Sequence, residues 1–196
     1  MPGILEIPEV RQRVSPLSVA EYRQLGEFNE HGRRTELIRG IVIEKVSKSP
    51  LHVAIAKRLY DWIAAKLPKG FVVRREDPIT MRDSEPEPDI AVVQGEESDF
   101  FRAHPSTAEL IVEVAVTSAA LDRANADLYA EAGVKEYWIV LALDRKVEVY
   151  RQPENGRYQQ VLLVEASETI ACSSVSQIRF NVGELFPATE SQGGRE

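Results

Sequence analysis

Three nearly uninterrupted apolar segments constrain the fold of this 196-residue chain most strongly. They read DIAVV from Asp89, ELIVEVAV from Glu109 and EYWIVLAL from Glu136. An apolar run that does not alternate with polar residues is typical of a strand covered on both faces. The stretch SAALDRANADLYAEAG lies between the second and third runs, has apolar residues at helical spacing and ends at Gly133. This order predicts a strand, helix, strand unit.

Polar start signals place two further helices and a hairpin. Ser18, followed three residues later by Glu21, forms the pattern of a capping box, so we expect a helix from Val19 to about Phe28. Ser49-Pro50 begins a longer predicted helix, whose apolar stripe is Val53, Ala56, Leu59, Tyr60 and Ile63. The segment RTELIRGIVIEKV predicts either two short strands joined near Gly40 or one bent strand. Asn155-Gly156 predicts a tight hairpin turn later in the chain.

Composition and length predict one domain without an obvious nucleic-acid signature. The chain has 24 Lys plus Arg and 31 Asp plus Glu, a net charge of −7, so binding to nucleic acid would need a local basic face. We expect an extended lead over residues 1–17, a single domain over 18–187 and a disordered tail over 188–196. Neither a secretory leader nor a run of roughly 18 apolar residues is apparent, which predicts a cytoplasmic protein without a membrane partner.

Two carboxylates occupy costly positions in the predicted strands. Asp89 follows Pro88 at the start of one apolar run, and Glu113 interrupts another. Burial of an unpaired carboxylate costs several kcal/mol, so Glu113 either faces water on an edge strand or has a partner. Two neighbouring carboxylates repel each other unless a cation lies between them, and hard oxygen ligands suit Mg²⁺ or Mn²⁺. The pair therefore favours the hypothesis of a metal site.

At these residues the sequence resembles the PD-(D/E)XK nuclease superfamily, and more closely the Uma family of bacterial putative restriction endonucleases. Six segments carry the resemblance, in the family's order: ELIRGIVIEK, SPLHVAIAKRL, EPDIAVV, LIVEVAVTS, DRANADLYAEAGVKEYWIV and VEVYRQP. The resemblance covers about residues 18–151, most of the chain. The resemblance implies an α/β protein of the α+β kind, with a restriction-endonuclease-like core in which helices flank a central mixed β-sheet. It also implies metal carboxylates at one end of that sheet.

The resemblance assigns expected roles to individual residues. Asp89, Glu113 and Glu36 correspond to metal-binding positions, and His52 corresponds to a substrate-binding position. The superfamily's catalytic lysine, two positions after the second acid, is replaced by Ala115 in this chain. In the Uma branch the lysine lies on the following helix, and Asn125 is its best match here, with Ala126 as the alternative position. An asparagine can orient water or donate to a phosphate, but it brings no positive charge.

Two functions from different classes follow from this resemblance. The first is an Mg²⁺- or Mn²⁺-dependent endonuclease that hydrolyses DNA, with Asp89, Glu113 and Asn125 as its catalytic residues. The second keeps the nuclease fold without catalysis and acts in nucleic-acid binding or protein interaction. Cleavage of both strands of a duplex by chains with one site each also predicts a homodimer.

Overall fold

The computed structural model describes residues 7–26 and 34–187, and it divides into two compact units. The first unit contains residues 1–46 and 80–86, and the second contains residues 47–79 and 87–196. The predicted tail, 188–196, and Phe28 lie outside the described residues. Within the described ranges, no helix combines the length and apolar content that a membrane crossing requires.

The first unit contains short helices and a hairpin. Its elements are α1 (Pro8–Arg11), α2 (Val19–Gly26), β1 (Thr35–Ile38) and β2 (Ile41–Glu44). The predicted lead therefore includes one helical turn, α1. The capping box at the start of α2 is confirmed: Ser18 N donates to Glu21 Oε2 over 2.8 Å, and Glu21 N donates to Ser18 Oγ over 3.2 Å. Two backbone groups at the helix start are thereby satisfied.

The segment around Gly40 forms two antiparallel strands, the first of the two predicted arrangements. Arg39 and Gly40 make the turn with φ of 49° and 76°. A side chain at Gly40 would place its Cβ 2.3 Å from the Cβ of Pro16, so both the backbone angle and the close packing require glycine. Residues 80–86 return to this unit, where Glu85 N donates to Leu37 O over 2.7 Å.

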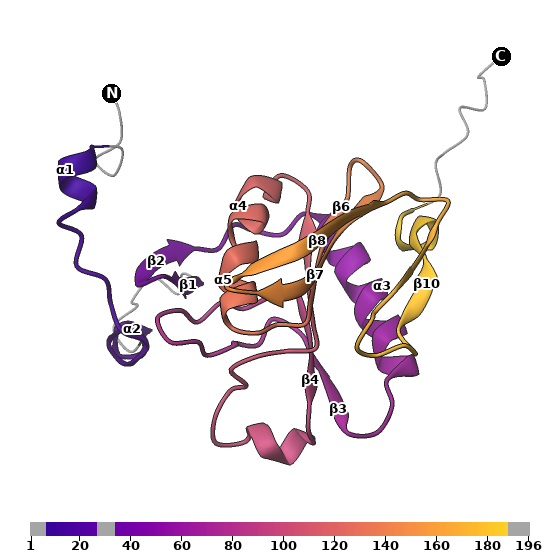
Figure 1. Cartoon of the computed structure of the whole chain (residues 1–196), viewed down its shortest axis with the longest axis horizontal. Coiled ribbons are helices and arrows are strands. Elements are labelled where there is room, and N and C mark those ends of the chain that lie inside the picture. Colours follow the sequence, from indigo (N-terminus) through magenta and orange to yellow (C-terminus); the bar gives the residue numbers. More distant parts are fainter. Residues whose placement is uncertain (1–6, 27–33, 188–196) are drawn as a thin grey trace. The chain divides into compact units, whose positions relative to one another are not determined.

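The second unit is built on a six-stranded sheet in the order β3-β4-β5-β6-β7-β8 (Figure 1). The strands are β3 (Phe71–Arg74), β4 (Ile90–Gln94), β5 (Leu110–Ala115), β6 (Glu136–Leu141), β7 (Lys146–Glu154) and β8 (Arg157–Val164). Only β5 and β6 pair in parallel, because a helical crossover joins them. The predicted mixed sheet flanked by helices is confirmed. The turn between β7 and β8 is the predicted one, with φ of 52° at Asn155 and 76° at Gly156.

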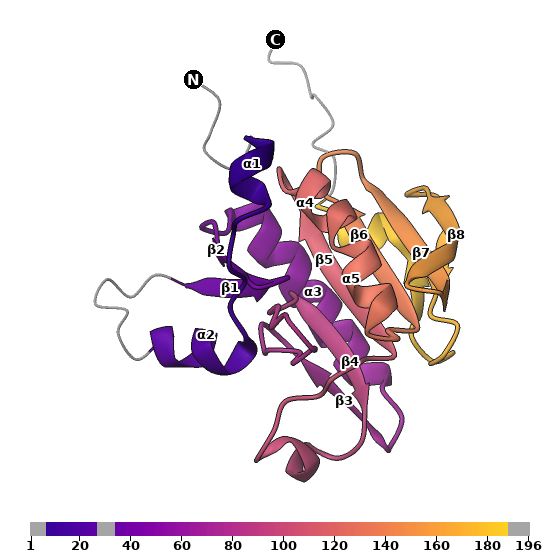
Figure 2. The same ribbon diagram turned by 60° about the vertical axis from the view of Figure 1, so that its left-hand side comes forward.

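Helices cover both faces of this sheet. The helices of the second unit are α3 (Pro50–Lys66), α4 (Ala119–Ala124) and α5 (Ala126–Glu131). Figures 1 and 2 show α3 on the opposite side of the sheet from α5. The remaining elements are η2 (Glu97–Phe100), the small antiparallel pair of β9 (Thr169–Ala171) and β10 (Arg179–Asn181), and η3 (Val182–Leu185). Because helices cover both faces of the sheet, the strands β4, β5 and β6 are buried on both sides, which explains their continuous apolar runs.

Two local predictions need correction. The helix α3 begins as predicted, since Ser49 Oγ accepts from His52 N, but Val53 is 41% exposed and Ile55 takes the buried place. Spacing alone did not separate these two faces, because apolar residues lie on both. The single helix predicted between β5 and β6 is two short helices, which meet at the buried Asn125. Asparagine has low helix propensity, because its side chain competes for nearby backbone groups.

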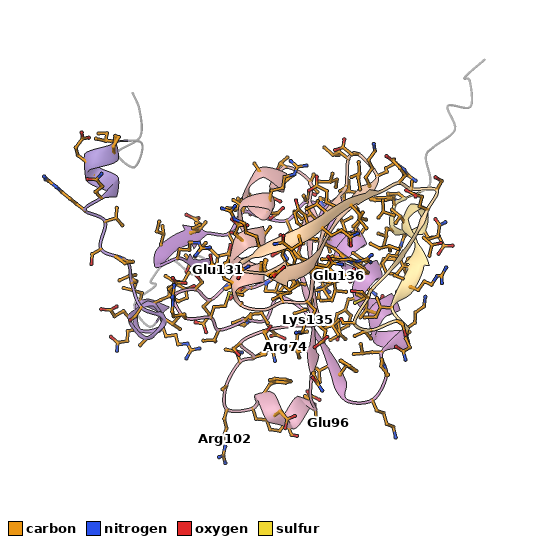
Figure 3. All side chains as sticks on the ribbon, in the orientation of Figure 1. Arg74, Glu96, Arg102, Glu131, Lys135 and Glu136 are labelled. Atoms are coloured by element: carbon orange, nitrogen blue, oxygen red, sulfur yellow. The ribbon has the colours of Figure 1, made fainter. Side chains whose placement is uncertain are left out.

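A fully buried carboxylate ties three segments of the second unit together. Glu136, at the start of β6, accepts hydrogen bonds from Trp138 Nε1 over 2.6 Å and from Ser173 N over 2.8 Å (Figure 3). Its Oε1 also lies 2.9 Å from Arg151 Nη2 on β7. Removal of one member of such a buried pair leaves the other charge without compensation.

We therefore expect Glu136→Gln to lower the free energy of unfolding by about 3 kcal/mol, within the range for broken buried ion pairs. Urea denaturation followed by circular dichroism measures the change. The exposed Glu97→Gln is the matched control, with an expected change within about 0.5 kcal/mol. Equal stability of the two variants would contradict a structural role for the Glu136 charge.

Candidate active site

The register of β4 and β5 brings the two predicted carboxylates together. These strands are antiparallel, with Ile90 opposite Val112, so the next position along places Asp89 opposite Glu113. Directly opposed residues of an antiparallel pair point to the same face of a sheet. Glu113 lies on an interior strand, because β5 is flanked by β4 and β6. The alternative of a water-facing edge strand for Glu113 is therefore wrong.

Each carboxylate accepts a hydrogen bond from the backbone of the other's strand. Asp89 N donates to Glu113 Oε2 over 3.1 Å, and Val114 N donates to Asp89 Oδ2 over 2.8 Å. These reciprocal bonds compensate part of the cost of burying charge in the sheet. They also fix the orientation of both side chains.

Two basic side chains complete the surroundings of Asp89. Lys48 Nζ lies 2.6 Å from Oδ1, and His52 Nε2 lies 2.9 Å from Oδ2. Asp89 itself is only 5% exposed. Its burial acts to raise the pKa, but the hydrogen bond and charge of His52, together with those of Lys48, outweigh burial and lower the pKa of Asp89 to about 2. Asp89 is therefore an anion at neutral pH.

Lys48 was not identified from the sequence as part of a site, and neither were two further residues of this arrangement, Glu76 and Tyr129. Glu76 Oε1 lies 3.0 Å from Lys48 Nζ, so Lys48 contacts two carboxylates. Tyr129 Oη, from α5, donates to Glu113 Oε1 over 3.1 Å. Burial acts to lower the pKa of Lys48, but the charges and hydrogen bonds of Asp89 and Glu76 raise it overall. Lys48 is consequently a stable cation.

The predicted site residues fall into two groups. Asp89, Glu113 and His52 are brought together, as described above. Glu36 belongs to the first unit, where its Oε2 lies 3.7 Å from Lys45 Nζ, and its part in a metal site stays a prediction. Asn125 is buried where α4 meets α5, one helical turn before Tyr129, whose N donates to Asn125 O over 3.1 Å. No hydrogen bond joins the Asn125 side chain to Asp89 or Glu113 within the described part of the chain.

The donor chemistry at Asp89 and Glu113 fits a hard divalent cation. Their carboxylates supply the oxygen ligands that Mg²⁺ prefers. Over residues 7–26 and 34–187, no group of three His, Cys, Asp or Glu side chains is assembled as a metal-binding cluster. Mg²⁺ commonly binds through one or two carboxylates and keeps several waters, so a pair of protein ligands is compatible with it.

The mixed sheet, with paired carboxylates at opposed positions of neighbouring strands, places the chain in the class of restriction-endonuclease-like α/β proteins. The profile of the Uma2 family, described as "Putative restriction endonuclease", matches residues 19–183, and the chain belongs to this family. The resemblance inferred from the sequence is thereby confirmed.

A solved structure shares this fold. It is that of a "putative nuclease belonging to DUF820" from Anabaena variabilis, with a TM-score of 0.74 and 21% sequence identity. The similarity covers 87% of this chain and 98% of that chain. The search of curated proteins finds no match. Family and fold together support a nuclease.

The low pKa of Asp89 predicts a specific loss of stability in acid. A carboxylate whose folded pKa lies below its unfolded value stabilises the protein above the unfolded pKa, and this contribution is lost as pH falls through the folded pKa. For a fall from 3.8 to about 2, the contribution is about 2 kcal/mol. Between pH 5 and pH 2 in EDTA, wild type should lose about 2 kcal/mol more unfolding free energy than Asp89→Asn.

Urea denaturation at each pH measures this difference, and the exposed Asp144→Asn should follow the wild-type curve. If the unfolding free energies of wild type and Asp89→Asn changed equally with pH, the pKa of Asp89 would not be lowered by folding.

Proposed function

We propose that the protein is a metal-dependent endonuclease that hydrolyses phosphodiester bonds in DNA. The observation that carries this proposal is the reciprocal bonding of Asp89 and Glu113, which orients two carboxylates at adjacent positions of neighbouring strands. Structural support alone does not require two carboxylates there. Membership of the Uma2 family supports the same class of chemistry.

Asp89 and Glu113 would hold Mg²⁺ or Mn²⁺. Such an ion, when bound, lowers the pKa of a coordinated water and stabilises negative charge on a phosphoryl oxygen. Within the chain, the backbone donors of Asp89 and Val114 keep the two carboxylates oriented. Tyr129 holds Glu113 from the helix side through its hydroxyl.

His52 and Asn125 have proposed roles in contact with substrate. His52 contacts the Asp89 carboxylate through Nε2. Its Nδ1 is buried and has no hydrogen-bond partner among the described residues. A water that entered the site could donate to this nitrogen, and a phosphate oxygen could accept from it when both ring nitrogens carry protons. Asn125 would orient a water or donate to a phosphate oxygen.

A second candidate is a nuclease-fold domain without catalytic activity that binds nucleic acid or another protein. The observation in its favour is the missing lysine on the helix after Glu113. Asn125 is neutral and Ala126 is apolar, so neither supplies the positive charge. The two candidates share the fold, so a measurement of hydrolysis has to separate them.

Supercoiled plasmid incubated with Mg²⁺ or Mn²⁺ should be nicked by the wild-type protein. Asp89→Ala and Glu113→Gln should each lower the rate on the order of 10²-fold or more, because each removes an oriented ligand. Addition of EDTA should abolish nicking. Gel electrophoresis over a time course provides the rates.

Asp144→Ala, at an exposed carboxylate, is the matched control and should retain the wild-type rate. Thermal unfolding of all variants checks that each is folded. Nicking that persists in Asp89→Ala would exclude this site as its source, and folded wild type without activity in either metal would favour the binding domain.

The protein is further proposed to act as a two-fold homodimer. One site per chain cuts one strand, and symmetric dimers are the commonest oligomers. Multi-angle light scattering at micromolar concentration should give about twice the chain mass of 22.0 kDa. A mass of one chain across that range would contradict the dimer.

A further inference from the structure

Lys48 places a positive charge directly beside the paired carboxylates. Its Nζ lies 2.6 Å from Asp89 Oδ1 and 3.0 Å from Glu76 Oε1, and its side chain is 20% exposed. Lys48 immediately precedes Ser49, the cap of α3, whose Oγ accepts from His52 N over 3.2 Å. The cap fixes the backbone next to Lys48, so the ammonium is held in position while part of the side chain stays open to solvent.

Glu76, the second carboxylate that contacts Lys48, has an unusual backbone conformation. Its φ is +55°, in the left-handed region that residues other than glycine seldom adopt. Its N donates to Pro88 O over 3.1 Å, which ties Glu76 to the residue just before Asp89. Strained conformations of this kind persist where the surrounding structure enforces them, and they concentrate at functional sites.

The charges at this point create a requirement for a cation. Asp89, Glu113 and Glu76 are three carboxylates on adjacent segments, and a phosphodiester that approached them would add another negative charge. The attack on phosphorus places further negative charge on the phosphoryl oxygens in the transition state. An ammonium already fixed beside Asp89 can stabilise this charge without reorganisation at the moment of reaction.

We infer that Lys48 is the side chain that contacts the scissile phosphate, and that Glu76 is a positioning residue that acts through Lys48. This inference rests on the proposed function and adds to it the source of the positive charge that Ala115 and Asn125 lack. Lys48 forms ion pairs with two carboxylates. If Asp89 binds a metal, the ion pair with Glu76 can therefore still keep Lys48 at the site.

An exclusively structural ion pair predicts different behaviour. In that case, loss of Lys48 lowers stability, but it changes neither the number of phosphate contacts nor the rate measured on folded protein. Each lysine contact to a DNA phosphate contributes about −0.9 to the slope of log K against log salt concentration. The salt dependence of binding therefore detects a phosphate contact independently of hydrolysis.

The test compares Lys48→Gln, Lys48→Arg and the control Lys57→Gln, which removes a charge from the 64%-exposed lysine on α3 that pairs with Asp61. Binding of a fluorescein-labelled 20-base-pair duplex is measured by anisotropy in EDTA over a series of KCl concentrations. Lys48→Gln should reduce the magnitude of the slope by about one, whereas Lys48→Arg and Lys57→Gln should retain it.

Plasmid nicking in Mg²⁺ provides the second measurement. Lys48→Gln should lower the rate on the order of 10²-fold, and Lys48→Arg should recover part of it because the charge remains. Glu76→Gln should lower the rate less than Lys48→Gln does. The double variant Lys48→Gln/Glu76→Gln should cleave no more slowly than Lys48→Gln alone. Glu76 acts through Lys48, so its loss has no further effect once the lysine is absent.

The possible outcomes separate this inference from the proposed function. An unchanged slope and an unchanged nicking rate in folded Lys48→Gln, with wild type active and Asp89→Ala inactive, would overturn the role of Lys48 and leave the endonuclease intact. A reduced slope without nicking by any protein would keep the phosphate contact and remove the endonuclease. A rate loss in folded Lys48→Arg equal to that in Lys48→Gln, together with unchanged slopes, would also overturn the inference, because neither the positive charge nor a phosphate contact would then account for the rate.

Discussion

The antiparallel register of β4 and β5 is the constraint on which the candidate site depends. With Ile90 opposite Val112, the side chains of Asp89 and Glu113 reach the same face of the sheet. A shift of one residue would send one of them to the face that α3 covers with apolar residues. The reciprocal hydrogen bonds across the two strands favour the observed register. Register and chemistry therefore support each other here.

Most of the framework could be predicted because its signals are local. The capping box at Ser18, the cap at Ser49, the turn at Asn155 and the three apolar runs each depend on a few neighbouring residues. The errors arose where tertiary contacts decide. Spacing could not distinguish exposed Val53 from buried Ile55, and it did not reveal that the helix between β5 and β6 is broken at Asn125.

The site was predicted only in part for the same reason. Asp89 and Glu113 could be identified from the sequence because each places a charge in an apolar run. Lys48 and Glu76 lie in polar stretches, where charged residues are common and carry no such signal. Lys48 is 41 residues from Asp89 in sequence, and only the folded chain joins them. The family resemblance places the lysine after Glu113, where this chain has Ala115 and Asn125, so it does not indicate Lys48. Glu36 remains a prediction, since it belongs to the first unit.

The dispersed origin of the site also has a consequence for folding. Lys48 and Glu113 meet Asp89 across sequence separations of 41 and 24 residues, so two long loops must close before these charges come together. Contacts of such range are formed late relative to local turns and helices. A nascent or partly unfolded chain therefore has separate, solvated charges in place of the assembled site. Whatever chemistry this site performs is therefore confined to the completed fold.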